Sequence, residues 1–96
     1  MRDNGTFLPS YIIGSSYRRE VFFEISKKKM VLQKDLITTT SHKYRSHVRR
    51  TLKDLTEKGL IVCKNPEDTR YKFYELSEKG KELKEEMKKY GYFVDD

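Results

Sequence analysis

The stretch SHVRRTLKDLTEKGLI, residues 46–61, decides the fold of this 96-residue chain. Its apolar residues continue a spacing of three and four that begins at Tyr44, and such spacing predicts one buried stripe on a helix. Ser41 is the expected N-cap and Gly59 the expected stop, so we predict a helix from His42 to Lys58. The stripe consists of Tyr44, Val48, Leu52 and Leu55.

The residues after this helix predict a β-hairpin and a closing helix. An apolar run at 60–63 and an aromatic-rich run at 71–76 flank the turn residues Asn65-Pro66-Glu67-Asp68. We therefore expect two strands joined by a loop of about four to six residues. Helical spacing returns between Ser77 and Gly91, which predicts the closing helix.

Three shorter elements are predicted upstream of residue 41. Ser16 can cap a helix from Tyr17 to about Lys28. Residues 30–31 suggest a short edge strand and residues 32–37 a short helix, with Leu36 and Ile37 facing inward. Threonines 38–40 should end that helix, because β-branched residues with hydroxyl groups continue a helix poorly. The apolar stripe of the first of these helices is Tyr17, Val21, Phe22 and Ile25.

Length and composition restrict the class of protein. With 38% charged and 35% hydrophobic residues, a chain this short supports one modest core rather than a multidomain enzyme. We divide it into an N-terminal arm (1–15), one folded domain (16–90) and a short tail (91–96). There is no apolar run of membrane-spanning or signal-peptide length, so we expect no membrane association and a cytoplasmic location. The lack of alanine and the many Lys, Glu and Tyr residues suit an A·T-rich genome or a hot-growing source.

The chain has few residues for catalysis or metal binding. Its single cysteine, Cys63, excludes an intramolecular disulfide and any multi-cysteine zinc or iron–sulfur framework. His42 and His47 have only Cys63 to join them, so we predict no metal site. The sequence has no nucleophile–base grouping and no glycine-rich phosphate loop, so neither an enzyme nor a cofactor is expected.

The net charge of +6 is concentrated between Tyr17 and Lys58. A basic region flanked by neutral or slightly acidic ends is typical of a surface that binds a polyanion. Charge alone fits solvated lysine-rich helices equally well. The order of the predicted elements, with a helix-turn-helix before a hairpin, favours the first interpretation.

Two segments, 46–61 and NPEDTRYKFYELSEKGKEL at 65–83, closely resemble winged helix-turn-helix transcriptional regulators of the MarR-like and archaeal type. The Leu-Ser-Glu-Lys-Gly motif of that group stands at 76–80, and the resemblance covers about Ser16 to Lys89. It implies an α+β, mainly α, winged-helix fold that binds double-stranded DNA. The Leu-x-x-Leu-x-x-x-Gly-Leu pattern of the group is matched by Leu52, Leu55, Gly59 and Leu60.

The exposed face of the predicted helix 42–58 would then enter the major groove of DNA. In helix-turn-helix proteins the N-terminal part of the recognition helix reaches base edges, where arginine can bind guanine with two hydrogen bonds. We expect base contacts from Arg45, Ser46 and Arg49. The expected phosphate contacts are Lys43, Arg50, Lys53 and Lys34, with Arg18 and Arg19 as further candidates and His42 and His47 as possible polar contacts.

The hairpin loop, called the wing in this family, carries Arg70 as its one strong cation for the minor groove. Asp68 is expected to brace Arg70 by a paired contact. Glu67 and Asp68 make the loop locally acidic, so we expect it to lie alongside the duplex rather than point at phosphates.

The apolar residues of the arm and of the closing helix exceed what a three-helix core needs. We prefer a homodimer built from these segments, which would bring two recognition helices to successive major grooves, over packing of the arm on the last helix within one chain. Phe23 lies off its helix stripe and belongs either to the arm contact or to a subunit contact. The expected dimer residues are Tyr11, Ile12, Ile13, Leu83, Met87 and Tyr90.

Two alternatives remain open from the sequence. One is a winged helix that docks a protein partner. The other is a redox- or ligand-gated repressor that uses Cys63, although a cysteine within an apolar strand is usually a small buried residue. The sequence contains no motif that identifies the operator sequence, the direction of regulation or a small-molecule effector.

Overall fold

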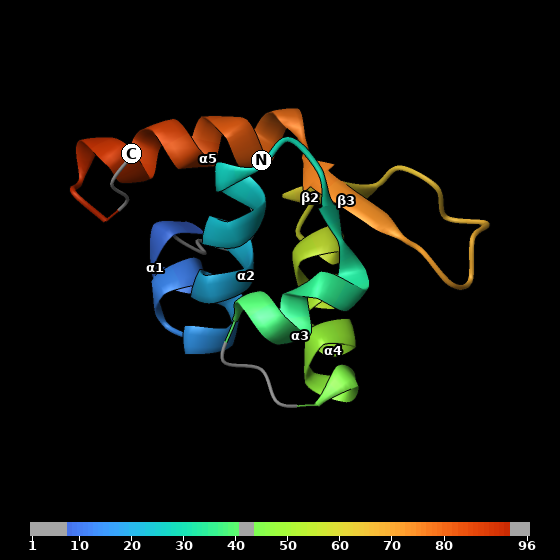
Figure 1. Cartoon of the computed structure of the whole chain (residues 1–96). Helices are drawn as coiled ribbons and strands as arrows, with labels where there is room; N and C mark the ends of the chain where they lie inside the picture. The colour runs from blue at the N-terminus through green and yellow to red at the C-terminus, as the bar shows by residue number, and fades with distance from the viewer. Residues whose placement is uncertain (1–7, 41–43, 93–96) are drawn as a thin grey trace.

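The computed structural model describes residues 8–40 and 44–92 (Figure 1). The order of elements is helix, helix, strand, short helices, helix, hairpin and helix. From the second helix onward this is the predicted order, whereas the first helix lies within the predicted arm and was not expected. Their bounds are α1 Leu8–Ile13, α2 Ser16–Lys27, β1 Val31–Leu32, the 3-10 helix η1 Gln33–Asp35, α3 Leu36–Thr39, α4 Arg45–Glu57, β2 Ile61–Cys63, β3 Phe73–Leu76 and α5 Glu78–Lys89.

A small antiparallel sheet joins the first half of the chain to the hairpin. Strand β3 lies in the middle, between β1 and β2. Val31 pairs with Tyr74 on one side of β3, and Cys63 pairs with Tyr74 on the other. The predicted edge strand is therefore present one residue later than expected, and the mainly α, winged-helix fold is confirmed.

The apolar stripes of α2 and α4 face each other in one core. Val48, Leu52 and Leu55 of α4 are all at most 1% exposed, as the spacing predicts. Gly59 follows the C-cap residue of α4 and turns the chain out of the helix with a φ of 76°, a conformation that favours glycine. The remaining buried apolar side chains are Ile12, Val21, Phe22, Ile25, Val31, Leu36, Leu60, Ile61, Tyr74, Leu76, Leu83 and Met87.

Two aromatic residues predicted for these stripes are exposed instead. Tyr44 is the N-cap of α4, with extended backbone angles of −127° and 140°, so its side chain leaves the helix face and is 63% exposed. Tyr17 lies in the first turn of α2 and is 40% exposed, with its ring 5.2 Å from that of His47. The helix predicted from His42 thus begins at Arg45, and residues 41–43 lie outside the described residues.

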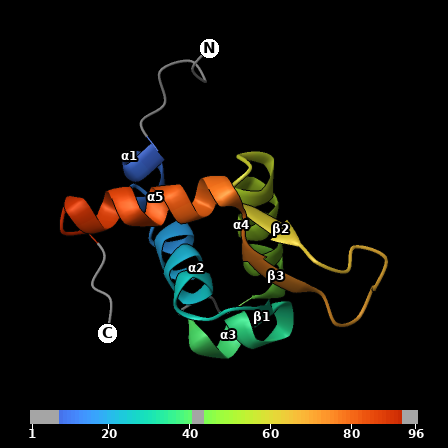
Figure 2. The ribbon, with the colours of Figure 1, turned by 90° about the horizontal axis from the view of Figure 1, so that it is seen from above.

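The threonine run and the hairpin loop also differ from expectation. Helix α3 ends within the threonine run, as predicted, but at Thr39 rather than before Thr38; the hydroxyl groups of Thr38 and Thr39 donate to the carbonyl oxygen of Asp35 one turn earlier. The segment between β2 and β3, residues 64–72, is longer than the predicted loop; we call it the wing loop. It extends away from the rest of the molecule (Figures 1 and 2).

Helix α5 crosses α1 and α2 on the side away from the first turn of α4 (Figures 1 and 2). Ile12, Leu83 and Met87 are at most 2% exposed, because α1 packs against α5 within one chain. These three side chains are therefore not open to a second copy, which corrects their assignment to a dimer surface. Tyr11 and Ile13 are half-buried and pack against the core, whereas Tyr90 is 54% exposed. None of the described helices has the length and hydrophobicity to cross a membrane.

Candidate nucleic-acid interface

The outer face of α4 carries the predicted DNA contacts. Arg45, Ser46 and Arg49 are exposed in its first two turns. Arg50 and Lys53 are exposed on the same helix, and Lys43 lies outside the described residues. Burial of the opposite stripe fixes this face toward solvent, so the helix presents its cations where a duplex can reach them.

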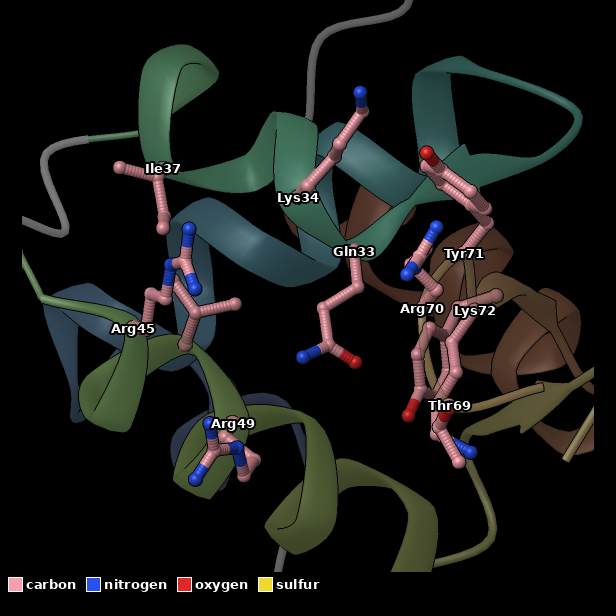
Figure 3. A pocket seen from close by; sticks show the side chains of 11 residues that line it. Gln33, Lys34, Ile37, Arg45, Arg49, Thr69, Arg70, Tyr71 and Lys72 are labelled. Atoms are coloured by element: carbon pink, nitrogen blue, oxygen red, sulfur yellow. The ribbon is translucent and has the colours of Figure 1, made fainter. Parts of the chain in front are cut away.

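A hollow of about 650 Å³ lies between η1, α3, α4 and the wing loop (Figure 3). No carboxylate is among the residues that line it. The positive potential of this surface is therefore offset only from outside its lining, by carboxylates such as that of Asp68 in the adjoining wing loop. The cationic side chains that line it are Lys34, Arg45, Arg49, Arg70 and Lys72.

These five cations differ in what already engages them. The ammonium of Lys34 lies 5.3 Å from the ring centroid of Tyr71, and that of Lys72 donates to the carbonyl oxygen of Pro66 at 2.8 Å. The guanidinium groups of the three arginines form no ion pair within the part of the chain that the structure describes. They therefore remain available to an anion.

Side chains of the wing loop hold its own backbone in shape. The carboxylate of Asp68 accepts hydrogen bonds from the backbone N–H groups of Arg70 and Tyr71, both at 2.7 Å. The Tyr71 and Arg70 N–H groups lower the pKa of Asp68, because they stabilise its charged form. Asp68 was expected to brace the guanidinium of Arg70; instead it fixes the backbone that carries this side chain.

Asn65 provides a second clamp at the base of the wing loop. Its amide donates to the carbonyl oxygen of Tyr71 at 2.7 Å, and its Oδ1 accepts the N–H of Phe73 at 2.8 Å. The Sγ of Cys63 lies 3.8 Å from the same Oδ1. Burial raises the pKa of the neighbouring Tyr74 hydroxyl, and Cys63 raises it further. Cys63 is half-buried here, so it is less exposed than the thiol of a redox sensor but is not a fully buried core side chain.

Two other basic candidates do not behave alike. The Nε of Arg18 donates to the carbonyl oxygen of Tyr11 at 2.7 Å, and its guanidinium lies 4.1 Å from the centroid of the Tyr11 ring. Arg18 therefore fixes α1 to α2, and its assignment as a phosphate anchor is not supported by this geometry. Arg19 is half-buried, and its role remains a prediction.

His47 packs as an aromatic side chain. Its ring lies 5.2 Å from that of Tyr17 and 5.4 Å from that of Tyr44. Its Nδ1 is buried without a hydrogen-bond partner in the described structure. Among the described residues no group of three His, Cys, Asp or Glu side chains could hold a metal ion.

The sequence did not identify Gln33, Thr69 or Tyr71, although all three line the hollow. Gln33 reaches it because its backbone N–H donates to the carbonyl oxygen of Lys72 at 2.8 Å, which extends the pairing of β1 with β3. The only sequence signal is that Gln33 is the one glutamine of the chain, and this does not predict its position.

A family model described as a winged helix DNA-binding domain matches residues 17–80 of the chain. This match spans α2 to the first turn of α5, and so includes every element around the hollow. No curated protein and no solved structure matches the chain.

Proposed function

The chain belongs to the winged-helix DNA-binding domain family, and on that premise we propose that it is a sequence-specific regulator of transcription that binds double-stranded DNA, of the MarR-like type. Helix α4 enters the major groove, and the wing loop brings Arg70 to the neighbouring minor groove. Arg45, Ser46 and Arg49 contact base edges. The phosphate contacts are Lys34, Arg50 and Lys53, with Lys43 as a further candidate.

One observation carries this proposal. The hollow between α4 and the wing loop is lined by five cations and no carboxylate, although the whole chain contains 15 Asp and Glu residues. A polyanion is the ligand whose affinity such a surface raises most. A partner protein would be expected to meet an apolar centre with a charged rim instead.

A salt titration of DNA affinity tests the proposal. If a dimer neutralises roughly eight to ten phosphates, log K should fall with log salt at a slope of about −7 to −9. Selection from a random DNA pool gives the preferred sequence and the spacing of half-sites in one experiment. A slope near zero at every sequence tested would refute DNA binding as the function.

Paired variants on α4 test the assigned roles. Arg49→Ala should weaken the selected site far more than random DNA, because it removes a base contact. Lys53→Ala should weaken both alike and make the slope shallower by about 0.9 for each bound subunit, or about 1.8 for a dimer, because it removes one phosphate contact per subunit. Lys89→Ala removes the same charge from the exposed end of α5 and is the matched control. Equal losses for Arg49→Ala and Lys53→Ala at both DNAs would contradict the assignment.

The homodimer remains part of this proposal. Two recognition helices on one duplex require half-sites about 34–36 Å apart, which the selected sequences would show as a repeat. With Ile12, Leu83 and Met87 buried inside one chain, the exposed Tyr90 is the member of the predicted set best available to a second copy. Sedimentation of the free chain and of the complex measures the stoichiometry.

A further inference from the structure

Gln33 lies at the centre of the hollow, and its side chain has no hydrogen-bond partner among the described residues (Figure 3). Its side chain extends from η1 into the space between α4 and the wing loop, with Arg49 on one side and Thr69 on the other (Figure 3). Its amide forms no hydrogen bond to any other described residue, whereas its backbone N–H is held by Lys72. The backbone at Gln33 is therefore fixed, while the amide end of its side chain has no hydrogen-bond partner among the described residues.

The place of the hollow on the fold determines which part of DNA can fill it. The major and minor grooves of a duplex are separated by the sugar–phosphate backbone of one strand. If α4 lies in one groove and the wing loop in the next, that strand passes between them. Gln33 is the side chain that extends into this passage from η1.

The chemistry of the surrounding groups suits a phosphate. A glutamine amide offers two N–H donors and no charge. The guanidinium groups of Arg45, Arg49 and Arg70 flank it without ion pairs among the described residues, and no carboxylate lines the hollow. Lys34, which follows Gln33 in η1, adds a further cation, and its ammonium lies over the ring of Tyr71.

We infer that the hollow seats the backbone of one DNA strand and that the amide of Gln33 donates a hydrogen bond to a phosphate oxygen at its centre. This inference rests on the proposed function. Gln33 is then a positioning residue: it fixes the register of the duplex against Arg45 and Arg49 and carries no base preference of its own. It is the neutral member of a contact set that is otherwise cationic.

Two substitutions separate the hydrogen bond from charge. Gln33→Met keeps the length of the side chain and removes the donor, and we expect a loss of affinity of about tenfold to a hundredfold at every sequence. Gln33→Glu keeps the shape and adds a negative charge, so its loss should be larger. Gln33→Met should not alter thermal unfolding, because the amide has no partner in the described structure and the backbone bond to Lys72 remains. Gln33→Glu should not lower the unfolding temperature, because its carboxylate would lie among the cations of the hollow.

The salt dependence gives the readout that distinguishes Gln33 from its cationic neighbours. Gln33→Met removes no charge, so the slope of log K against log salt should stay as in the unmodified chain. Arg70→Ala, the comparison variant from the same hollow, should make that slope shallower by about 0.9 for each bound subunit, or about 1.8 for a dimer. A slope that changes equally in both variants would overturn the assignment of Gln33 as a neutral donor.

Uncharged methylphosphonate groups placed one at a time along each strand locate the contact. We expect one or two positions on one strand of each half-site at which this replacement weakens binding by the unmodified chain and has a much smaller effect on Gln33→Met. An additive loss at all positions would refute the phosphate contact. A Gln33→Met loss that disappears on changing one base pair would also refute it, and would identify the amide as a reader of adenine.

The failure of this inference is distinguishable from that of the proposed function. DNA binding with a steep salt slope but no position-dependent coupling to Gln33 removes only the phosphate seat. Absence of DNA binding by the unmodified chain removes both.

Discussion

Gly80 offers a test in which local propensity and tertiary packing predict opposite signs. It is the third residue of α5, and its N–H donates to the side chain of its N-cap, Ser77, at 3.0 Å. An alanine in a helix is favoured over glycine by up to about 1 kcal/mol, so propensity predicts that Gly80→Ala stabilises the chain. The surroundings of Gly80 predict the reverse.

The magnitude follows from how closely α5 approaches the residue that precedes β2. A Cβ added at Gly80 would lie well under 3.0 Å from the carbonyl oxygen of Leu60 and 3.1 Å from its carbonyl carbon. Leu60 is fully buried, and the same oxygen accepts the N–H of Ser77 at 3.0 Å. Overpacking of this kind costs about 1–3 kcal/mol, and the upper end of that range applies here because the clashing atom belongs to the backbone. After the gain in propensity, we expect a net loss of about 2 kcal/mol.

Thermal and urea unfolding measure this loss directly. For a domain of this size about 1 kcal/mol shifts Tm by roughly 4–8 °C, so Gly80→Ala should lower Tm by at least about 8 °C. Glu82→Ala, at an exposed position of the same helix, is the control and should change stability by less than about 0.5 kcal/mol. A Tm equal to or above that of the unmodified chain would show that α5 does not approach Leu60 as described.

Three further predictions concern the wing loop and the arm. Asp68→Ala removes a negative charge beside the hollow, yet we expect it to weaken DNA binding, because the backbone N–H of Arg70 loses its hydrogen-bond acceptor. Tighter binding in a gel shift would mean that removing the negative charge matters more than ordering the wing loop. The pKa of Asp68 is lowered in the folded chain, so its carboxylate stabilises the fold fully near neutral pH, and this stabilisation is lost as the pH falls through the lowered pKa. The NMR signal of the Arg70 amide can follow this protonation. Tyr11→Leu removes the ring that the guanidinium of Arg18 and the ammonium of Lys58 face, at 4.1 Å and 5.1 Å from its centroid, and should cost about 1–2 kcal/mol in urea unfolding. An unchanged midpoint would mean that these contacts do not stabilise the packing of α1.

The fold was predictable where one local signal determines the outcome. The spacing of Val48, Leu52 and Leu55 identifies the buried face of α4, and Gly59 identifies the residue at which the connection needs a positive φ. The sequence motif that ends in Gly80 was recognised as a pattern only. Its physical reason, the approach to Leu60, requires the structure, because those residues lie far apart in the sequence.

Helix beginnings were harder to predict because several hydroxyl and aromatic residues compete for the same position. Ser41 has the side chain of an N-cap, but the residue that takes that position for α4 is Tyr44, without a side-chain hydrogen bond to the helix. Tyr44 also continues the apolar spacing, so periodicity alone assigned it to the core. An N-cap residue has extended backbone angles, and its side chain does not follow the helix face.

Part of the candidate site could likewise be predicted from the sequence, and part could not. The cations of α4 could be predicted, because the buried stripe leaves only the opposite face for Arg45 and Arg49. The hollow could not, because it depends on the pairing of β1 with β3 and on the hydrogen bond from Gln33 to Lys72. A neutral residue gives no charge signal in a sequence, so Gln33 could be found only from its place between α4 and the wing loop.

The apolar residues of the arm and of α5 show a limit of a different kind. Their excess correctly indicated that a surface had to be covered, but an amphipathic pattern carries no information about what covers it. A second copy and another segment of the same chain satisfy the pattern equally. The structure buries Ile12, Leu83 and Met87 in one core, with α1 packed against α5, and so uses much of the apolar surface assigned to a partner. A dimer built from these two segments would therefore use what α1 and α5 leave exposed, around Tyr90 and Tyr92, and the C-terminal end of α5 lies away from the first turn of α4 (Figures 1 and 2). Pairing through it would leave both DNA-facing hollows open.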